Sequence, residues 1–171
     1  MKKMKLNQNY KHIVKLLLDS RHLKTNDFYQ SLDKLIFRLI GHKLLTLMVI
    51  DQSGKYVERV YSNNKKIYPL LGTKPIPTNE WTKRVLIEKK EFLGSNYKQI
   101  KKFFFDHETI KSLGCGSIIN LPVINNKKVL GTLNILHKEN YYNKTNLKEV
   151  RDFAQLLSPY FISHQINMKK K

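Results

Sequence analysis

The sequence predicts an α+β domain built on an antiparallel sheet, with helices at both ends of the chain. Apolar residues recur at helical spacing over residues 10–40 and again from residue 145, whereas two pairs of apolar runs between them are each joined by a short turn. Strands and helices do not alternate along the chain as they do in parallel βαβ sheets. We therefore expect the strands to pair as hairpins and the helices to cover the outside of the sheet.

The N-terminal part predicts a pair of helices. Residues 10–22 carry an apolar stripe at helical spacing. Thr25 and Asn26 can cap a second helix, and Gly41 can end it. The apolar face of this second helix consists of Phe28, Leu32, Leu35, Ile36 and Leu39.

The first predicted hairpin follows directly. Residues 43–51 and 55–62 are apolar runs of strand length, and a short connection containing Gly54 favours their antiparallel pairing. The next segment, residues 63–77, contains three prolines and a glycine, so it cannot be regular structure throughout. Loops of this length in a compact domain are often functional.

The middle of the chain predicts short elements. Thr78 or Asn79 can cap a helix over residues 80–90. After it the sequence predicts a short strand and two short helices, over residues 91–95, 96–105 and 106–114. Asp106 is well placed to cap the last of these.

The clearest hairpin lies near the C-terminus. Two apolar runs, residues 116–124 and 129–137, flank the turn sequence Asn-Asn-Lys-Lys. A closing helix is expected to begin near Thr145. Its apolar stripe is formed by Leu147, Val150, Ala154, Leu157 and Phe161.

The formal charge of +19 raises the question of polyanion binding. The lysines are spread over every segment together with abundant asparagine, and dense clusters occur only at the two termini. This distribution favours a compositional bias, and arginine, the better residue for clamping phosphate, is scarce. Nucleic acid is therefore not the expected partner; if the lysine surface did bind polyanions, affinity would fall steeply with salt.

Composition also restricts location and cofactor chemistry. No apolar run approaches the roughly 20 residues of a membrane-spanning helix, and the basic N-terminus lacks a cleavage site, so we expect a cytoplasmic protein that makes no membrane contact. A single cysteine, Cys115, excludes an intramolecular disulfide and a cysteine-based zinc cluster. The six histidines lack ligand spacing, and we expect neither a metal nor a cofactor.

Residues 116–161 resemble the C-terminal part of a GAF domain: a small residue and Ser, an apolar strand ending in Leu-Pro-Val, a turn, a Gly-Thr-Leu strand and a closing helix. The resemblance covers essentially the whole chain, and residues 59–86 resemble a subgroup of free-standing bacterial GAF proteins. It implies a single domain over 1–171, with a helical N-terminus, a core and a C-terminal helix at 8–40, 44–136 and 145–165. The family's sheet carries the terminal helices on one face, often as a dimer interface, and a small-molecule pocket on the other.

The expected function is therefore a sensor that binds a small polar or carboxylate-bearing metabolite between the sheet and residues 63–113. An aromatic pair with Lys, Ser and Asn can bind a small anion. Polar residues inside the apolar strands either lie on a solvated face or contact a polar ligand. The candidate ligand-binding residues are Tyr61, Ser62, Asn63, Tyr68, Lys74, Trp81, Asp106, Ser117, Asn120, Thr132 and Asn134.

An enzyme remains the alternative. Cys115, His107 and Asp106 are candidate catalytic groups for a hydrolase or isomerase that uses the same pocket. Each also has an ordinary structural interpretation: a buried inert thiol, a surface or packing imidazole, and a helix cap. The family's methionine sulfoxide reductases depend on several cysteines, so a single cysteine argues against that activity.

Overall fold

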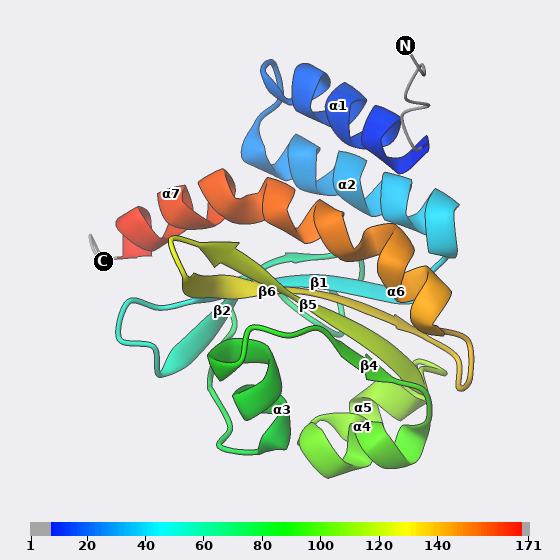
Figure 1. Ribbon diagram of the computed structural model, residues 1–171. Helices are drawn as coiled ribbons and strands as arrows, with labels where there is room; N and C mark the ends of the chain where they lie inside the picture. Colours follow the sequence, from blue (N-terminus) through cyan, green and yellow to red (C-terminus); the bar gives the residue numbers. More distant parts are fainter. Residues whose placement is uncertain (1–7, 169–171) are drawn as a thin grey trace.

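The computed structural model describes residues 8–168, and its centre is a six-stranded antiparallel sheet (Figure 1). The strand order is β3-β2-β1-β6-β5-β4. In chain order the strands are β1 (Leu44–Ile50), β2 (Tyr56–Ser62), β3 (Thr73–Pro75), β4 (Phe92–Gly94), β5 (Ser117–Asn125) and β6 (Lys128–His137). The predicted α+β class and both predicted hairpins are confirmed. The terminal lysine clusters, at residues 1–5 and 169–171, lie outside the described residues.

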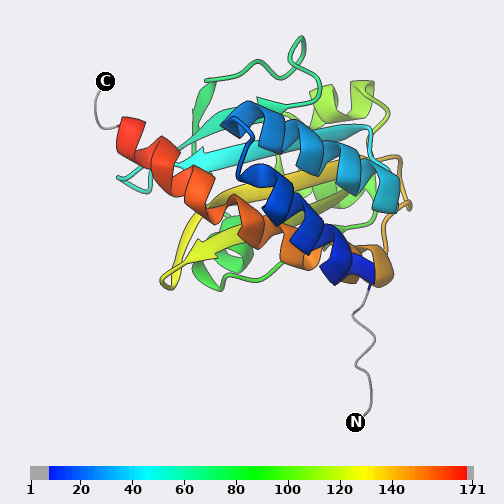
Figure 2. The same ribbon diagram turned by 90° about the horizontal axis from the view of Figure 1, so that it is seen from above.

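The terminal helices cover one face of the sheet. They are α1 (Gln8–Ser20), α2 (Thr25–Ile40), α6 (Lys144–Val150), the 3-10 segment η2 (Arg151–Leu157) and α7 (Ser158–Met168). Figure 2 shows α2 and the C-terminal helices lying over the sheet, with α1 outermost. The Phe28 ring of α2 stacks on the Tyr160 ring of α7, with 4.2 Å between centroids.

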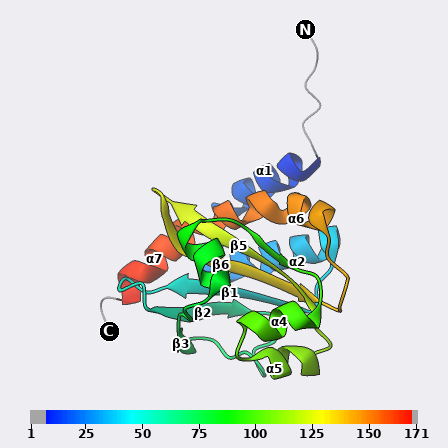
Figure 3. The ribbon, with the colours of Figure 1, turned by 60° about the horizontal axis from the view of Figure 1, so that its bottom comes forward.

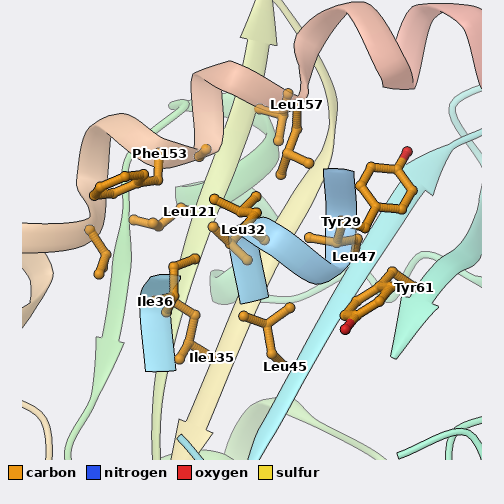
Figure 4. Close-up of a cluster of buried hydrophobic side chains, with 14 of the residues drawn as sticks. Tyr29, Leu32, Ile36, Leu45, Leu47, Tyr61, Leu121, Ile135, Phe153 and Leu157 are labelled. Atoms are coloured by element: carbon orange, nitrogen blue, oxygen red, sulfur yellow. The ribbon is translucent and has the colours of Figure 1, made fainter. Parts of the chain in front are cut away.

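The main core lies between these helices and the sheet. On β1 the side chains of Leu45, Leu47 and Val49 are buried in it, as strand alternation requires. Figure 4 shows Leu45 and Leu47 packed near Leu32 of α2. The C-terminal helices contribute Phe153, Ala154, Leu157 and Phe161, so the stripe predicted for the closing helix is confirmed.

The closing helix is divided into three labelled parts. Pro159 has no backbone N–H, so the carbonyl of Gln155 cannot receive its usual i+4 hydrogen bond. The backbone N–H of Ser158 bonds that carbonyl instead, which is the tighter 3-10 pattern. The sequence predicted the stripe but not this local tightening.

The other face of the sheet carries α3 (Glu80–Thr82), the π-helical turn η1 (Lys83–Ile87), α4 (Tyr97–Phe103) and α5 (His107–Ser112) (Figure 1). The predicted cap of the first of these is confirmed, because the Asn79 side chain accepts a hydrogen bond from the Thr82 N–H. Two other capping predictions are wrong. Lys24 is the N-cap of α2 and makes no side-chain cap, and Asp106 occupies the N-cap position of α5 without a capping hydrogen bond.

A two-residue turn joins β5 to β6. Asn126 and Lys127 have φ values of 44° and 63°, the left-handed pair that a tight hairpin turn requires. Asparagine adopts such values more readily than most residues, which is why an Asn-rich turn was a hairpin signal. No helix within residues 8–168 combines the length and apolar character of a membrane span.

Candidate functional site

A cavity lies between the open face of the sheet and the segments that connect β2 to β5. Figure 3 shows this side of the molecule, with α4, α5 and the chain around β3 over the strands. The cavity has a volume of about 80 Å³. At roughly 10–15 Å³ per water, it can hold a small organic molecule. The sequence predicted a pocket in this position.

The floor of the cavity contains a hydrogen-bonded chain of two amides and one threonine hydroxyl from three adjacent strands, here called the amide chain. Asn120 on β5 donates from Nδ2 to Oδ1 of Asn134 on β6 at 2.7 Å, and Asn134 donates from Nδ2 to Oγ1 of Thr46 on β1 at 3.2 Å. The three residues are at most 7% exposed, which excludes the solvated face that the sequence left open. Strand register explains their proximity, because Asn134 lies opposite both Asn120 and Thr46.

Trp81 connects this floor to the opposite wall. Its indole Nε1 donates to Oδ1 of Asn120 at 2.9 Å, across 39 residues of sequence. The indole also packs edge-on against Phe104, with 5.5 Å between ring centroids. Thr132 lies on the same floor, and its hydroxyl makes no hydrogen bond within residues 8–168, which leaves it available to a ligand.

A charged cluster lies at one side of the cavity. The Tyr68 hydroxyl donates to Oδ2 of Asp106 at 3.1 Å, and the Lys74 Nζ lies 4.0 Å from the same oxygen. The Arg59 guanidinium lies 4.8 Å from the centroid of the Tyr68 ring and donates from Nη1 to the carbonyl of Pro69 at 2.9 Å. The cluster thus contains two cations and one carboxylate, and of the two cations Lys74 lies within ion-pair distance of that carboxylate.

Burial governs the ionisation of the cluster. Desolvation lowers the pKa of Lys74, and the nearby Asp106 carboxylate opposes part of this effect. Desolvation and the Asp106 carboxylate raise the pKa of Tyr68, so its phenol stays protonated near neutral pH. Asp106 thus serves as an acceptor for neighbouring groups and not as the predicted helix cap.

The remaining walls are apolar. Sheet residues supply Leu44, Met48, Ile50, Val57, Ile118 and Leu136, and the covering segments supply Ile76, Pro77, Leu86, Phe103, Phe104, Phe105 and Ile110. A mainly apolar cleft with a few convergent polar groups is the usual form of a small-molecule site.

Arg59 is the charged residue of the cavity lining that the sequence analysis missed. Simple alternation on β2 gives Arg59 and Tyr61 the same face. The register between β1 and β2 shifts at Leu47/Met48, so Arg59 pairs with Met48 whereas Tyr61 pairs with Leu47. This bulge brings Arg59 into the cavity and directs Tyr61 into the helical core, where its hydroxyl donates to Asp33 at 2.5 Å.

The other expected ligand residues divide into two groups. Tyr68, Lys74, Trp81, Asp106, Asn120, Thr132 and Asn134 line the cavity, whereas Tyr61, Ser62, Asn63 and Ser117 do not. The polar residues of the second group bind the backbone: Asn63 accepts from the Leu45 N–H, and the Ser117 hydroxyl donates to the Lys138 carbonyl. Ser62 accepts from the N–H of Asn64.

The three candidate catalytic residues have separate partners. Asp106 interacts with Tyr68 and Lys74, whereas Nδ1 of His107 lies 2.8 Å from the Tyr97 hydroxyl. Cys115 is buried and does not line the cavity, and its burial raises the pKa of the thiol to about 11. A nucleophilic thiol needs the opposite shift. Among the described residues, no group of three or more His, Cys, Asp or Glu side chains is arranged to hold a metal ion.

Solved structures with a similar fold are GAF domains. One comes from an Acinetobacter phosphoenolpyruvate-protein phosphotransferase (TM-score 0.70, 12% identity, covering 97% of this chain and 99% of that chain). A second comes from the corresponding enzyme of Coxiella burnetii (TM-score 0.67, 12% identity, 95% and 97%). A third belongs to a two-component sensor histidine kinase of Bacillus halodurans (TM-score 0.67, 14% identity, 84% and 97%).

Comparison of the sequence with protein-family models and with curated proteins found no significant match. At identities of 12–14%, the structural likeness shows the fold and nothing finer.

Proposed function

We propose that this chain, which has the fold of a GAF domain, is a cytoplasmic sensor that binds a small metabolite in the cavity between β1, β2, β5, β6 and the covering segments. The observation that carries the proposal is the cavity itself, in which an apolar interior ends at a floor of ordered amides and a charged cluster. Such a combination supplies both the burial and the few directional contacts that a small ligand needs. The structural similarity to the GAF domain of a sensor histidine kinase is consistent with a sensing role.

The metabolite is proposed to be mostly apolar, with one polar or carboxylate-bearing end. Apolar side chains outnumber polar ones in the lining, and the charged residues among them are Arg59, Lys74 and Asp106. A polar molecule without an apolar part would leave most of this lining in contact with water, which is the less favourable arrangement.

The sheet connects ligand binding to the helical face. Alternate residues of β1 face the cavity and the helical core: Thr46 and Met48 line the cavity, whereas Leu45 and Leu47 pack in the core with the helices. Contacts that differ between the free and the bound state on one face therefore bias packing on the other. Because a close-packed core has low compressibility, a displacement of β1 on the cavity side also displaces the side chains that pack against the helices.

A homodimer through the terminal helices is the proposed output surface. The outer side of α1 leaves Tyr10, Val14, Leu17 and Leu18 each about half exposed. These residues recur at helical spacing, so they form one apolar stripe beyond the contacts of α1 with the rest of the domain. A second copy packed on this stripe would bury it and would link the two sensing cavities.

The enzyme alternative has less support. Cys115 and His107 do not line the cavity, and the candidate groups are not assembled around one reacting position. Of the three, Asp106 alone lines the cavity, and it is held by Tyr68 and Lys74.

The test is a binding screen with two independent readouts. Purified protein is screened by thermal shift against amino acids, nucleotides, cyclic nucleotides and small carboxylates, because a ligand specific to the folded state raises the melting temperature. Trp81 is the single tryptophan and lines the cavity, so its fluorescence reports occupancy directly.

Matched variants assign a hit to the cavity. Trp81→Ala should abolish the thermal shift, whereas Tyr61→Phe, on the opposite face of the sheet, should retain it. Mass spectrometry of the hit over time separates a sensor from an enzyme. Turnover of the ligand, or a hit that Trp81→Ala leaves unchanged, would contradict the proposal.

A further inference from the structure

We propose that the ligand is a small apolar monocarboxylic acid whose carboxylate is bound by Arg59 with the help of Lys74; this inference rests on the proposed function of the cavity. It goes further by assigning the sign and the number of the ligand's charges, and by naming a binding residue that the sequence pattern did not indicate.

The first argument is the incomplete set of partners around Arg59. Arg59 is 9% exposed, and none of the ion pairs in residues 8–168 includes it. Its Nε is buried without a hydrogen-bond partner, and its one side-chain hydrogen bond goes from Nη1 to Pro69. A guanidinium has five N–H donors, and a buried charge is costly until such donors are satisfied.

The second argument is a count of charge. Arg59 and Lys74 each contribute one positive charge, and Asp106 contributes one negative charge, so the cavity has an excess of one positive charge. These are the charged residues of the lining, and Tyr68 stays neutral because its hydroxyl keeps its proton while donating a hydrogen bond to Asp106. One monoanion neutralises the cavity. A zwitterion would leave the excess in place, and a dianion would reverse it.

The third argument is shape. A carboxylate matches the planar fork of a guanidinium, which favours it over other single negative charges. The rest of the ligand meets apolar and aromatic side chains, among them Met48, Ile118 and Phe104. A cavity of about 80 Å³ has room for a short branched or single-ring body and is small for a nucleotide.

The experiment compares molecules that share a carbon skeleton and differ in charge. The probes are 4-methylpentanoate and phenylacetate, the carboxamide of each, and the corresponding α-amino acids leucine and phenylglycine. Dissociation constants are measured by Trp81 fluorescence at neutral pH and constant salt. We expect each acid to bind at least about tenfold more tightly than its amide, because hydrogen bonds to a charged partner are stronger than neutral ones. The amino acids should bind more weakly than the acids.

Variants assign the preference to Arg59. Arg59→Met keeps an unbranched side chain but removes the charge. It should reduce the ratio of acid affinity to amide affinity to near one, with little change in the dissociation constant of the amide. Arg84→Met is the matched control, since Arg84 does not line the cavity and bonds the Glu91 carbonyl. If Arg59→Met does not fold, Lys74→Met gives a second test, because it also removes the excess positive charge.

The outcomes separate the two proposals. Equal binding of acid and amide, tighter binding of the amino acids, or an unchanged ratio in the Arg59 and Lys74 variants would overturn the inference. If neither acid binds at millimolar concentration while another molecule in the wider screen binds and is lost in Trp81→Ala, the inference fails and the proposed function stands. If no molecule binds, both fail.

Discussion

Asn134→Leu tests whether the amide chain on the cavity floor holds the sheet and its covering segments together. Asn134 is 7% exposed and bonds both of its neighbours across the sheet, at 2.7 Å to Asn120 and 3.2 Å to Thr46. Leucine has a similar volume, so the substitution removes two hydrogen bonds without opening a large cavity. It also leaves the Nδ2 donor of Asn120 without its acceptor.

The expected cost follows from these lost contacts. A buried polar group deprived of its partner costs about 1–3 kcal/mol, and a second weakened contact adds about 1 kcal/mol, partly offset by the apolar gain of leucine. With the offset included, we expect the free energy of unfolding to fall by about 1–3 kcal/mol. For a chain of this length that lowers the melting temperature by roughly 2–12 °C.

Thermal and urea denaturation measure this effect, with Thr132→Val as the matched control. Thr132 lies on the same strand and faces the same cavity, but its hydroxyl makes no hydrogen bond within residues 8–168. Thr132→Val should change stability by less than about 1 kcal/mol. Equal melting temperatures for wild type and Asn134→Leu, or an equal loss in both variants, would refute the structural role of the amide chain.

Three further predictions concern other parts of the molecule. Gly131→Ala should reduce stability by about 3 kcal/mol or more in urea denaturation, because the added Cβ would lie 2.7 Å from the Phe161 ring and also collide with a strand carbonyl. Cys115 should react with iodoacetamide at pH 8 at least about 100-fold more slowly than an unperturbed thiol, because raising the pKa from 9.0 to about 11 reduces its thiolate fraction; fast labelling of the native protein would contradict this. Leu17→Glu with Leu18→Glu should convert the proposed dimer to a monomer in analytical ultracentrifugation without changing ligand affinity, and a wild-type monomer would rule out that interface.

Local patterns in the sequence determined most of the secondary structure. The β5–β6 hairpin was predictable because its turn and its two apolar runs are adjacent in the sequence. The helix stripes were predictable for the same reason, since each depends on residues a few positions apart. The fold class followed from the order of these elements.

The positions of two cavity side chains depended on residues that are distant in the sequence. The bulge opposite Leu47 and Met48 arises from the pairing of two strands, so β2 alone gave no sign that Arg59 faces the cavity and Tyr61 the core. Asp106 was assigned to its own helix by proximity in the sequence, but Tyr68, 38 residues away, supplies its partner. Rules based on residues that are adjacent in the sequence do not include such distant hydrogen-bond partners.

The sequence by itself therefore determined the terminal helices and the two hairpins, and its resemblance to GAF domains implied the side of the sheet on which the pocket lies. The tertiary structure alone decided which polar groups share that pocket. Arg59, Lys74 and Asp106 come from three separate segments, and their excess positive charge exists only where those segments meet. Periodicity reports which face of an element is buried, whereas the partner of a buried charge is set by packing between elements that are distant along the chain.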